Sequence, residues 1–305
     1  MEKWITLAPI NAYFDSENKL SIPFSFDNSL SLNFLPEWTK NNEFTKHMSF
    51  YQREGIIKES KLAFLAEYDA ESLGDSDSTR TGQETSVCSK QDVAAEKITF
   101  ANISLWIIMP SSLGYQMILH NNESDGEWFL RQMYTVNDIR IDESQFENRL
   151  TNENLECAKN LYSIICQLPR KNSLWIAIRS IQHALMLPSW EFSFLLFWVS
   201  LEALFGTASE LTYRLALRTA NFLAEDRQEA KKIFSDIKKI YQHRSKVVHG
   251  RGAPGKGIDD RREMMLETQT LLRCSLSKIL LSKDKINVFN SEGRDEYLDE
   301  LCLKQ

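Results

Sequence analysis

Apolar residues recur at helical spacing from about residue 150 onward, and this period constrains the fold more than any other feature of the chain. Leu155, Ala158, Leu161, Tyr162 and Ile165 recur at spacings of three and four residues. Side chains at these steps share one face of an α-helix. The pattern therefore predicts an amphipathic helix over residues 152–168.

Further helices are predicted by the same spacing and by the residues at its ends. Pro188 stops one helix because proline cannot donate a backbone hydrogen bond, and Gly206 and Gly250 end two others. Ser209 is the expected N-cap of another. The second half should be an all-helical bundle of five or six helices, over 152–168, 173–187, 190–205, 209–224, 227–249 and 260–281.

The first part of the chain is typical of an α+β domain. Short runs rich in β-branched and aromatic residues, separated by turn signals, predict a small meander of strands over 98–110, 115–122 and 127–136. The polar segment near 69–92 has almost no large apolar groups, and we expect a mobile loop there. We therefore expect two domains: an α+β recognition or regulatory domain over 1–148 and a helical domain over 149–305.

Composition indicates a soluble globular protein and argues against several kinds of site. Of the 305 residues, 43% are hydrophobic, which is enough to build a core. No run approaches the ~18 apolar residues of a membrane span, and the N-terminus lacks a signal-peptide pattern. The five cysteines are scattered and form no CxxC pair, so neither a disulfide framework nor a zinc site is indicated. We expect a cytoplasmic protein without a metal or cofactor.

Positive charge is concentrated in one segment of the chain. The formal net charge of −6 argues by itself against a nucleic-acid partner. From Arg227 to Arg262, however, eleven basic residues stand against four acidic ones, which gives this segment +7 and leaves −13 for the rest. The distribution of charge therefore leaves room for an anionic partner at this segment.

Arg244 lies in the apolar stripe of the helix predicted over 227–249. The other residues of that stripe are Ile233, Ile237, Ile240, Tyr241, Val247 and Val248. A guanidinium on a packing face cannot lose its proton, so it needs an anion. Glu202, isolated in an apolar run, is the expected structural partner. A phosphate, which the guanidinium can bind with two hydrogen bonds, is the functional one.

His249 follows Arg244 by five residues, just before a glycine-rich segment. On an ideal helix the two side chains lie about 140° apart and do not share a face. They converge if the arginine stem wraps round the helix, if the helix unwinds at Gly250, or if two copies of the helix pair. Histidine exchanges a proton near neutral pH, as acid-base catalysis requires. The structural alternative makes His249 a helix C-cap.

Three motifs follow one another in this half of the chain: FWVSLEALFG, SELTYRLALRTANFLAED and IKKIYQHRSKVVHGRG. In this order they resemble the HEPN superfamily, and in particular its ApeA-like branch, over roughly residues 150 to 282. The resemblance implies a helical bundle that forms a homodimer, with the R-x4-H helices of both copies lining one cleft. Active members of the family are metal-independent endoribonucleases, frequently in phage defence, abortive infection or toxin–antitoxin systems.

Carried over to this chain, the resemblance implies that Arg244 binds phosphate and that His249 is the acid-base histidine. We add Glu202, the expected ion-pair partner, and Ser245, which follows the arginine, as auxiliary residues of the site. The expected reaction is attack of an RNA 2′-hydroxyl on its neighbouring phosphate. It leaves a 2′,3′-cyclic phosphate and a 5′-hydroxyl. Ser245 stands where many members of the family carry Asn, Asp or His after the arginine.

Further basic residues are candidates for RNA binding: Arg214, Arg218, Lys246 and Arg251. Arg214 and Arg218, four residues apart on one helical face, would extend a phosphate track. Tyr213 and Tyr241 are candidates for stacking on a base, but aromatic residues at helical spacing are more often core, and we interpret both as core residues. The expected partners are RNA, with tRNA one candidate, a second copy of the chain, and an inhibitor or trigger protein. No membrane partner is expected.

Two alternatives to the ribonuclease stay open. In the first, the chain is a non-catalytic HEPN dimer that binds nucleic acid, a nucleotide or a partner protein, and Ser245 favours this reading. In the second, the chain is purely structural, and Arg244 and Glu202 form an internal ion pair. The N-terminal part resembles no family, and we expect it to recognise a target or to restrain the nuclease.

Overall fold

The chain divides into two compact units by its internal contacts. The sheet unit comprises Met1–Leu105, Leu113–Thr135 and Glu143–Cys166, and the helical unit comprises Trp106–Ser112, Val136–Asp142 and Gln167–Gln305. The computed structural model describes residues 3–10, 20–40, 48–50, 52–58, 60–69, 88–109, 117–122, 128–133, 150–207, 211–249 and 258–303.

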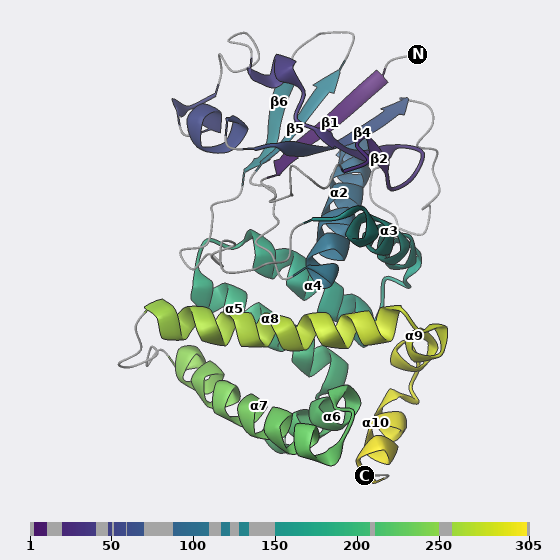
Figure 1. Ribbon diagram of the computed structural model, residues 1–305, viewed down its shortest axis with the longest axis vertical. Helices are drawn as coiled ribbons and strands as arrows, with labels where there is room; N and C mark the ends of the chain where they lie inside the picture. The colour runs from purple at the N-terminus through teal and green to yellow at the C-terminus, as the bar shows by residue number, and fades with distance from the viewer. Residues whose placement is uncertain are drawn as a thin grey trace. The chain divides into compact units, whose positions relative to one another are not determined.

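An antiparallel sheet forms the centre of the sheet unit (Figure 1). Its strands are β1 Lys3–Ile10, β2 Phe24–Ser25, β3 Leu30–Phe34, β4 Leu62–Asp69, β5 Met117–Asn122 and β6 Trp128–Met133. They are arranged in the order β2-β3-β4-β1-β5-β6, so the first strand lies between β4 and β5. The strands predicted over 115–122 and 127–136 are confirmed as β5 and β6.

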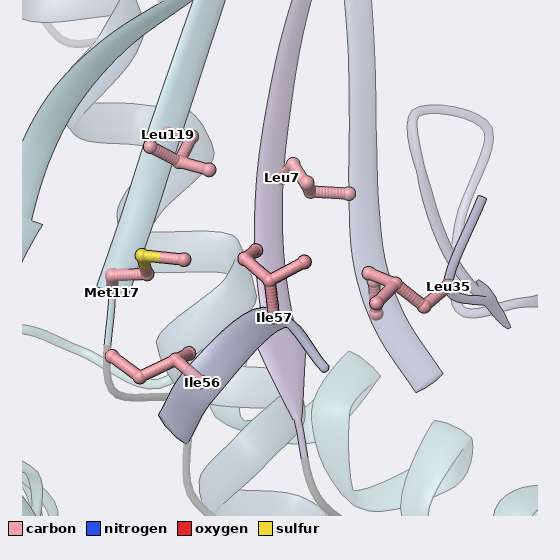
Figure 2. Packing of buried hydrophobic residues seen from close by; sticks show 7 residues of the cluster. Leu7, Leu35, Ile56, Ile57, Met117 and Leu119 are labelled. Atoms are coloured by element: carbon pink, nitrogen blue, oxygen red, sulfur yellow. The ribbon is translucent and has the colours of Figure 1, made fainter. Parts of the chain in front are cut away.

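Apolar side chains of the sheet pack against the π-helical turn η2 (Gln52–Ile57), and Figure 2 shows this cluster. The cluster consists of Leu7, Leu35, Ile56, Ile57, Ala63, Met117 and Leu119. Each of these side chains is almost completely removed from water. Burial of apolar surface is the main favourable term in folding, so this cluster contributes to the stability of the sheet. The short helix η1 (Glu37–Lys40) precedes η2 along the chain.

Helix α2 (Cys88–Ile108) stands where the sequence predicted a strand over 98–110, and that prediction is wrong. Every side chain from Ile98 to Ile107 is buried. A helix that is apolar all round has no amphipathic period, so its β-branched and aromatic residues imitate those of a buried strand. α2 also includes residues 88–92 of the segment expected to be a mobile loop. Residues 70–87 of that segment lie outside the described part of the chain.

Asp27 joins three segments of the sheet unit through its carboxylate. It accepts hydrogen bonds from the backbone N–H of Ser29 (2.7 Å), from Nζ of Lys97 in α2 (2.9 Å) and from the hydroxyl of Tyr162 in α3 (2.6 Å). Burial opposes ionisation of the carboxyl group. The hydrogen bonds from Tyr162, Lys97 and Ser29 and the charge of Lys97 outweigh it and lower the pKa of Asp27 to about 2.

The helix α3 (Asn152–Gln167) is confirmed where its apolar period predicted it, but it belongs to the sheet unit. Besides the Tyr162 contact, its Asn152 side chain accepts a hydrogen bond from the backbone N–H of Ser21 (2.7 Å). The expected domain boundary at 148/149 had placed this helix with the later ones. The apolar period predicts the helix but does not say which unit its buried face packs against.

The helical unit contains α4 to α10 among its described residues (Figure 1). Their bounds are α4 Asn172–Met186, α5 Trp190–Phe205, α6 Leu211–Leu223, α7 Arg227–Val248, α8 Ile258–Leu280, α9 Lys283–Phe289 and α10 Arg294–Leu303. The helices predicted over 173–187, 190–205, 209–224, 227–249 and 260–281 are confirmed as α4 to α8. None of the described helices is long and apolar enough to cross a membrane.

The ends and the last helices of the helical unit were only partly predicted from the sequence. α9 and α10 were not predicted, because seven and ten residues hold too few apolar positions to show a period. Ser209, the expected N-cap of α6, lies outside the described residues. The N-cap of α7 is Asp226, whose carboxylate accepts hydrogen bonds from the backbone N–H groups of Gln228 and Glu229. This cap fixes where α7 starts.

Replacing Asp27 with asparagine should cost roughly 1–2 kcal/mol of stability at about pH 5, after allowance for the partial exposure of the carboxylate. The folded pKa lies below the ordinary value of 3.8, so the contribution is present above that value and is lost as the pH falls toward 2. Urea unfolding of both proteins across this range measures the difference. A difference that stays constant with pH would mean that the charge of Asp27 does not stabilise the fold.

Candidate functional site

Glu202 lies one turn before the end of α5, in a helix whose neighbouring residues are apolar. Trp198, one turn earlier, is completely buried, and so is Leu201. The Glu202 side chain keeps 19% of its surface exposed. A carboxylate in such surroundings needs donors close by, because burial without hydrogen bonds is costly.

Two residues of α7 donate to this carboxylate. Nη2 of Arg244 lies 3.1 Å from Oε1 of Glu202 and donates a hydrogen bond to Oε2 at 3.4 Å. The hydroxyl of Tyr241 donates to Oε1 at 3.2 Å. The ion pair that the sequence predicted between Arg244 and Glu202 is therefore present, and it links α5 to α7.

The Arg244 guanidinium is only partly used by this pair. Its side chain is 24% exposed, and its carbon Cζ lies 5.4 Å from the centre of the Tyr241 ring, within the range of a cation–π contact. Among the described residues, no acceptor is within hydrogen-bond reach of its buried Nε. A further anion could therefore approach the guanidinium only on its exposed part and not at Nε.

Tyr241 was interpreted as a core residue, and its ring is indeed buried, but its hydroxyl has a role that this interpretation missed. The ring packs edge-on against Trp198 with centroids 5.2 Å apart. Burial, and then the charge of Glu202, raise the pKa of Tyr241 above its usual value, so the hydroxyl stays a donor. The signal in the sequence is the three-residue step from Tyr241 to Arg244, which brings both to one helix face.

His249 is the C-cap of α7 and is exposed. Its backbone N–H donates to the carbonyl of Ser245 at 3.1 Å, which closes the last turn. Lys246 is exposed, and Ser245 is half-buried. Arg251 lies outside the described residues. The structure therefore places His249 at an open helix end and Arg244 on the face that meets α5.

Arg218 is buried, and the expectation that it binds RNA beside Arg214 is wrong. Its side chain is 2% exposed and forms ion pairs with Asp295 (3.2 Å) and Asp299 (2.8 Å) of α10. It also donates to the carbonyl of Gly206, at the end of α5. Arg218 therefore anchors α10 to the connection between α5 and α6. Arg214 is half-buried on α6.

Tyr213 is exposed, contrary to its interpretation as a core residue. About half of its surface, 52%, is open to solvent. Its ring stands edge-on to Phe234 of α7, with centroids 5.6 Å apart. α6 has several apolar residues to bury, and Leu215, Ala216 and Phe222 occupy its buried face instead.

The described residues hold no group of three or more His, Cys, Asp or Glu side chains placed to share a metal ion. Comparisons of the chain with protein-family models, with curated proteins and with solved structures found no match. The resemblance to the HEPN superfamily therefore stays a prediction from the three motifs.

Replacing both Asp295 and Asp299 with alanine should destabilise the protein by roughly 3 kcal/mol, because it leaves the buried Arg218 guanidinium without a counter-charge. Arg218→Met should cost less, since methionine fills similar space without a charge. Urea unfolding compares the variants. The matched control is Glu263→Ala with Glu292→Ala, which removes two exposed carboxylates of the same unit. If the two double variants are equally stable, the ion pairs of Arg218 do not stabilise the fold.

Proposed function

We propose that the helical unit is a HEPN-type endoribonuclease that cleaves RNA by 2′-hydroxyl transesterification, without a metal ion. A role in phage defence, abortive infection or a toxin system follows from the family resemblance. The observation that carries the proposal is the state of Arg244: a partly exposed guanidinium on the R-x4-H helix that is held through Nη2 by one carboxylate. Such a group suits a phosphate.

Arg244 would bind the scissile phosphate through the donors that face away from Glu202. As charge builds on the non-bridging oxygens, a fixed guanidinium stabilises it more than it stabilises the bound substrate. Glu202 and Tyr241 hold the guanidinium in place before RNA arrives. Glu202 is therefore a positioning residue in this proposal and does not touch the reacting atoms.

His249 would move the protons of the reaction. The 2′-oxygen loses its proton and attacks the adjacent phosphorus, and the bond from phosphorus to the 5′-oxygen breaks. The leaving 5′-oxygen takes up a proton, which leaves a 2′,3′-cyclic phosphate on one product and a 5′-hydroxyl on the other. DNA is excluded as a substrate because it has no 2′-hydroxyl.

A second copy of the chain is part of the proposal. Arg244 and His249 lie about 140° apart around α7, so one helix directs them to different sides. Two α7 helices related by a two-fold axis would bring the arginine of one copy toward the histidine of the other. The homodimer through the helical unit follows from this requirement.

The second candidate function is a non-catalytic dimer that binds nucleic acid, a nucleotide or a partner protein. The ion pair between Arg244 and Glu202 favours it, because an arginine with a carboxylate partner has a structural reason to be present. Binding of RNA without cleavage would support this candidate.

The purified chain should cleave total RNA in the presence of EDTA, with 2′,3′-cyclic phosphate ends on the products. His249→Ala should lower the rate by about 100-fold or more, as expected for loss of an acid-base group. Arg244→Lys keeps the charge but loses the planar fork, and should have an effect of similar size. End-group analysis and initial rates measure both.

The matched control for these variants is His183→Ala, which removes an exposed histidine of the same unit, on α4. It should cleave RNA at the parent rate. Each variant is also checked for its circular dichroism spectrum and its oligomeric state. Unchanged cleavage by folded His249→Ala would exclude the proposed mechanism.

Mixing the two inactive variants tests whether the site is shared between copies. A mixed dimer of Arg244→Ala and His249→Ala chains contains one site with both groups intact if arginine and histidine come from different copies. After random exchange of subunits, about a quarter of the parent activity should return. No recovery in a mixture shown to form mixed dimers would place both groups of a site on one chain.

A further inference from the structure

The outward side of α7 carries a line of exposed lysines that the proposed reaction does not use, and this line leads to His249. α7 has seven basic and two acidic residues, a net charge of +5. Lys231, Lys238, Lys246 and His249 are all exposed. The helix of 22 residues is about 33 Å long, so this line is long enough to face several nucleotides.

Helix geometry places these residues along one face. Lys231 and Lys238 are seven residues apart, about 20° short of two full turns, and His249 follows Lys231 after five full turns. Lys246 lies about 60° to one side of this line. The acidic residues Glu229 and Asp236 lie about 140–160° away from Lys231, on the other side of the helix. The line therefore has no carboxylate of α7 within it.

Two aromatic rings border the same line: the half-buried Phe234 and the exposed Tyr213. Phe234 lies one turn before Lys238, whose Nζ is 5.3 Å from the centre of its ring. Tyr213 of α6 stands against Phe234 and exposes about half of its surface. A row of cations beside an exposed aromatic ring is the combination by which proteins hold single-stranded nucleic acid: the cations bind phosphates, and a base stacks on the ring.

We propose that this face of α7, with Tyr213, is a binding track for single-stranded RNA that leads to His249. Lys231, Lys238 and Lys246 bind backbone phosphates, and Tyr213 stacks on an unpaired base. That the ligand of this track is RNA rests on the proposed function. The track itself rests on the exposed cations, the absence of carboxylates among them in α7, and the ring beside them. It replaces the track that the sequence had drawn through Arg218.

Single-stranded RNA fits this face better than a duplex or an acidic protein. A base can stack on Tyr213 only if it is unpaired, so the ring contributes no binding energy to a duplex. An acidic peptide would satisfy the lysines but would offer no planar group to the ring. The ring is therefore the feature that separates these occupants.

Binding is measured by fluorescence anisotropy with a labelled 2′-O-methyl RNA strand, which the chain cannot cleave because its 2′-oxygen carries no proton. The probe is titrated with the full chain at several salt concentrations. Lys231→Ala with Lys238→Ala should reduce the slope of log affinity against log salt by about 1.4, since each phosphate contact on a single strand contributes about 0.7. Tyr213→Ala should weaken binding by about fivefold or more, and Tyr213→Phe should restore it.

The matched control is Lys171→Ala with Lys283→Ala, which removes two exposed lysines of the same unit away from α7. Its salt slope should equal that of the parent. A slope unchanged by the Lys231 and Lys238 substitutions would overturn the track, as would equal binding of the duplex form of the probe or displacement of the probe by polyglutamate at equal charge.

The outcomes separate this inference from the ribonuclease proposal. In one outcome, the parent chain binds the probe with the predicted dependence on Lys231, Lys238 and Tyr213 but fails to cleave unmodified RNA. That outcome supports the binding track and contradicts the ribonuclease proposal. If the chain cleaves RNA, and the Lys231 and Lys238 variant binds the probe as well as the Lys171 and Lys283 control, the ribonuclease proposal is supported and the binding track is contradicted. Absence of any binding overturns the track and also removes RNA as the partner.

Discussion

The packing of α7 on α5 depends on how the carboxylate of Glu202 is satisfied. Tyr241 and Arg244 both donate to it from α7, one through a hydroxyl and the other through a guanidinium. Two donors one turn apart reach a single carboxylate here, and this contact favours the rotation of α7 that points Tyr241 and Arg244 toward α5. The rotation then determines which residues of α7 face solvent, and these are the lysines and His249.

The same contact stabilises the partly buried charge of Arg244 when no ligand is bound. A guanidinium that waited for phosphate with no anion nearby would bear the full cost of its partly buried charge. Glu202 offsets that cost through its contact with Nη2 of Arg244. In the proposed reaction Arg244 keeps this contact, and the Tyr241 hydroxyl also donates to Glu202, so the carboxylate is not left without a partner.

The spacing of apolar residues, and single charged residues within apolar runs, were enough to predict part of this arrangement from the sequence. The helices α3 to α8 follow from apolar spacing, and the pair of Glu202 and Arg244 follows from two charges placed where apolar residues were expected. α2 was missed because a helix buried on all sides has no period. The role of Arg218 was missed because its partners lie 77 and 81 residues further along the chain. Tyr213 was misplaced because spacing alone does not say which aromatic residue of a helix is covered.

Arg218 also has a consequence for the order in which the protein forms. The two carboxylates that neutralise this buried guanidinium belong to α10, the last helix described. A chain leaving the ribosome presents α5, α6 and α7 well before α10, and during that interval Arg218 has no counter-ion from α10. The helical unit therefore reaches its full stability only after α10 has been synthesised and has packed against the connection between α5 and α6.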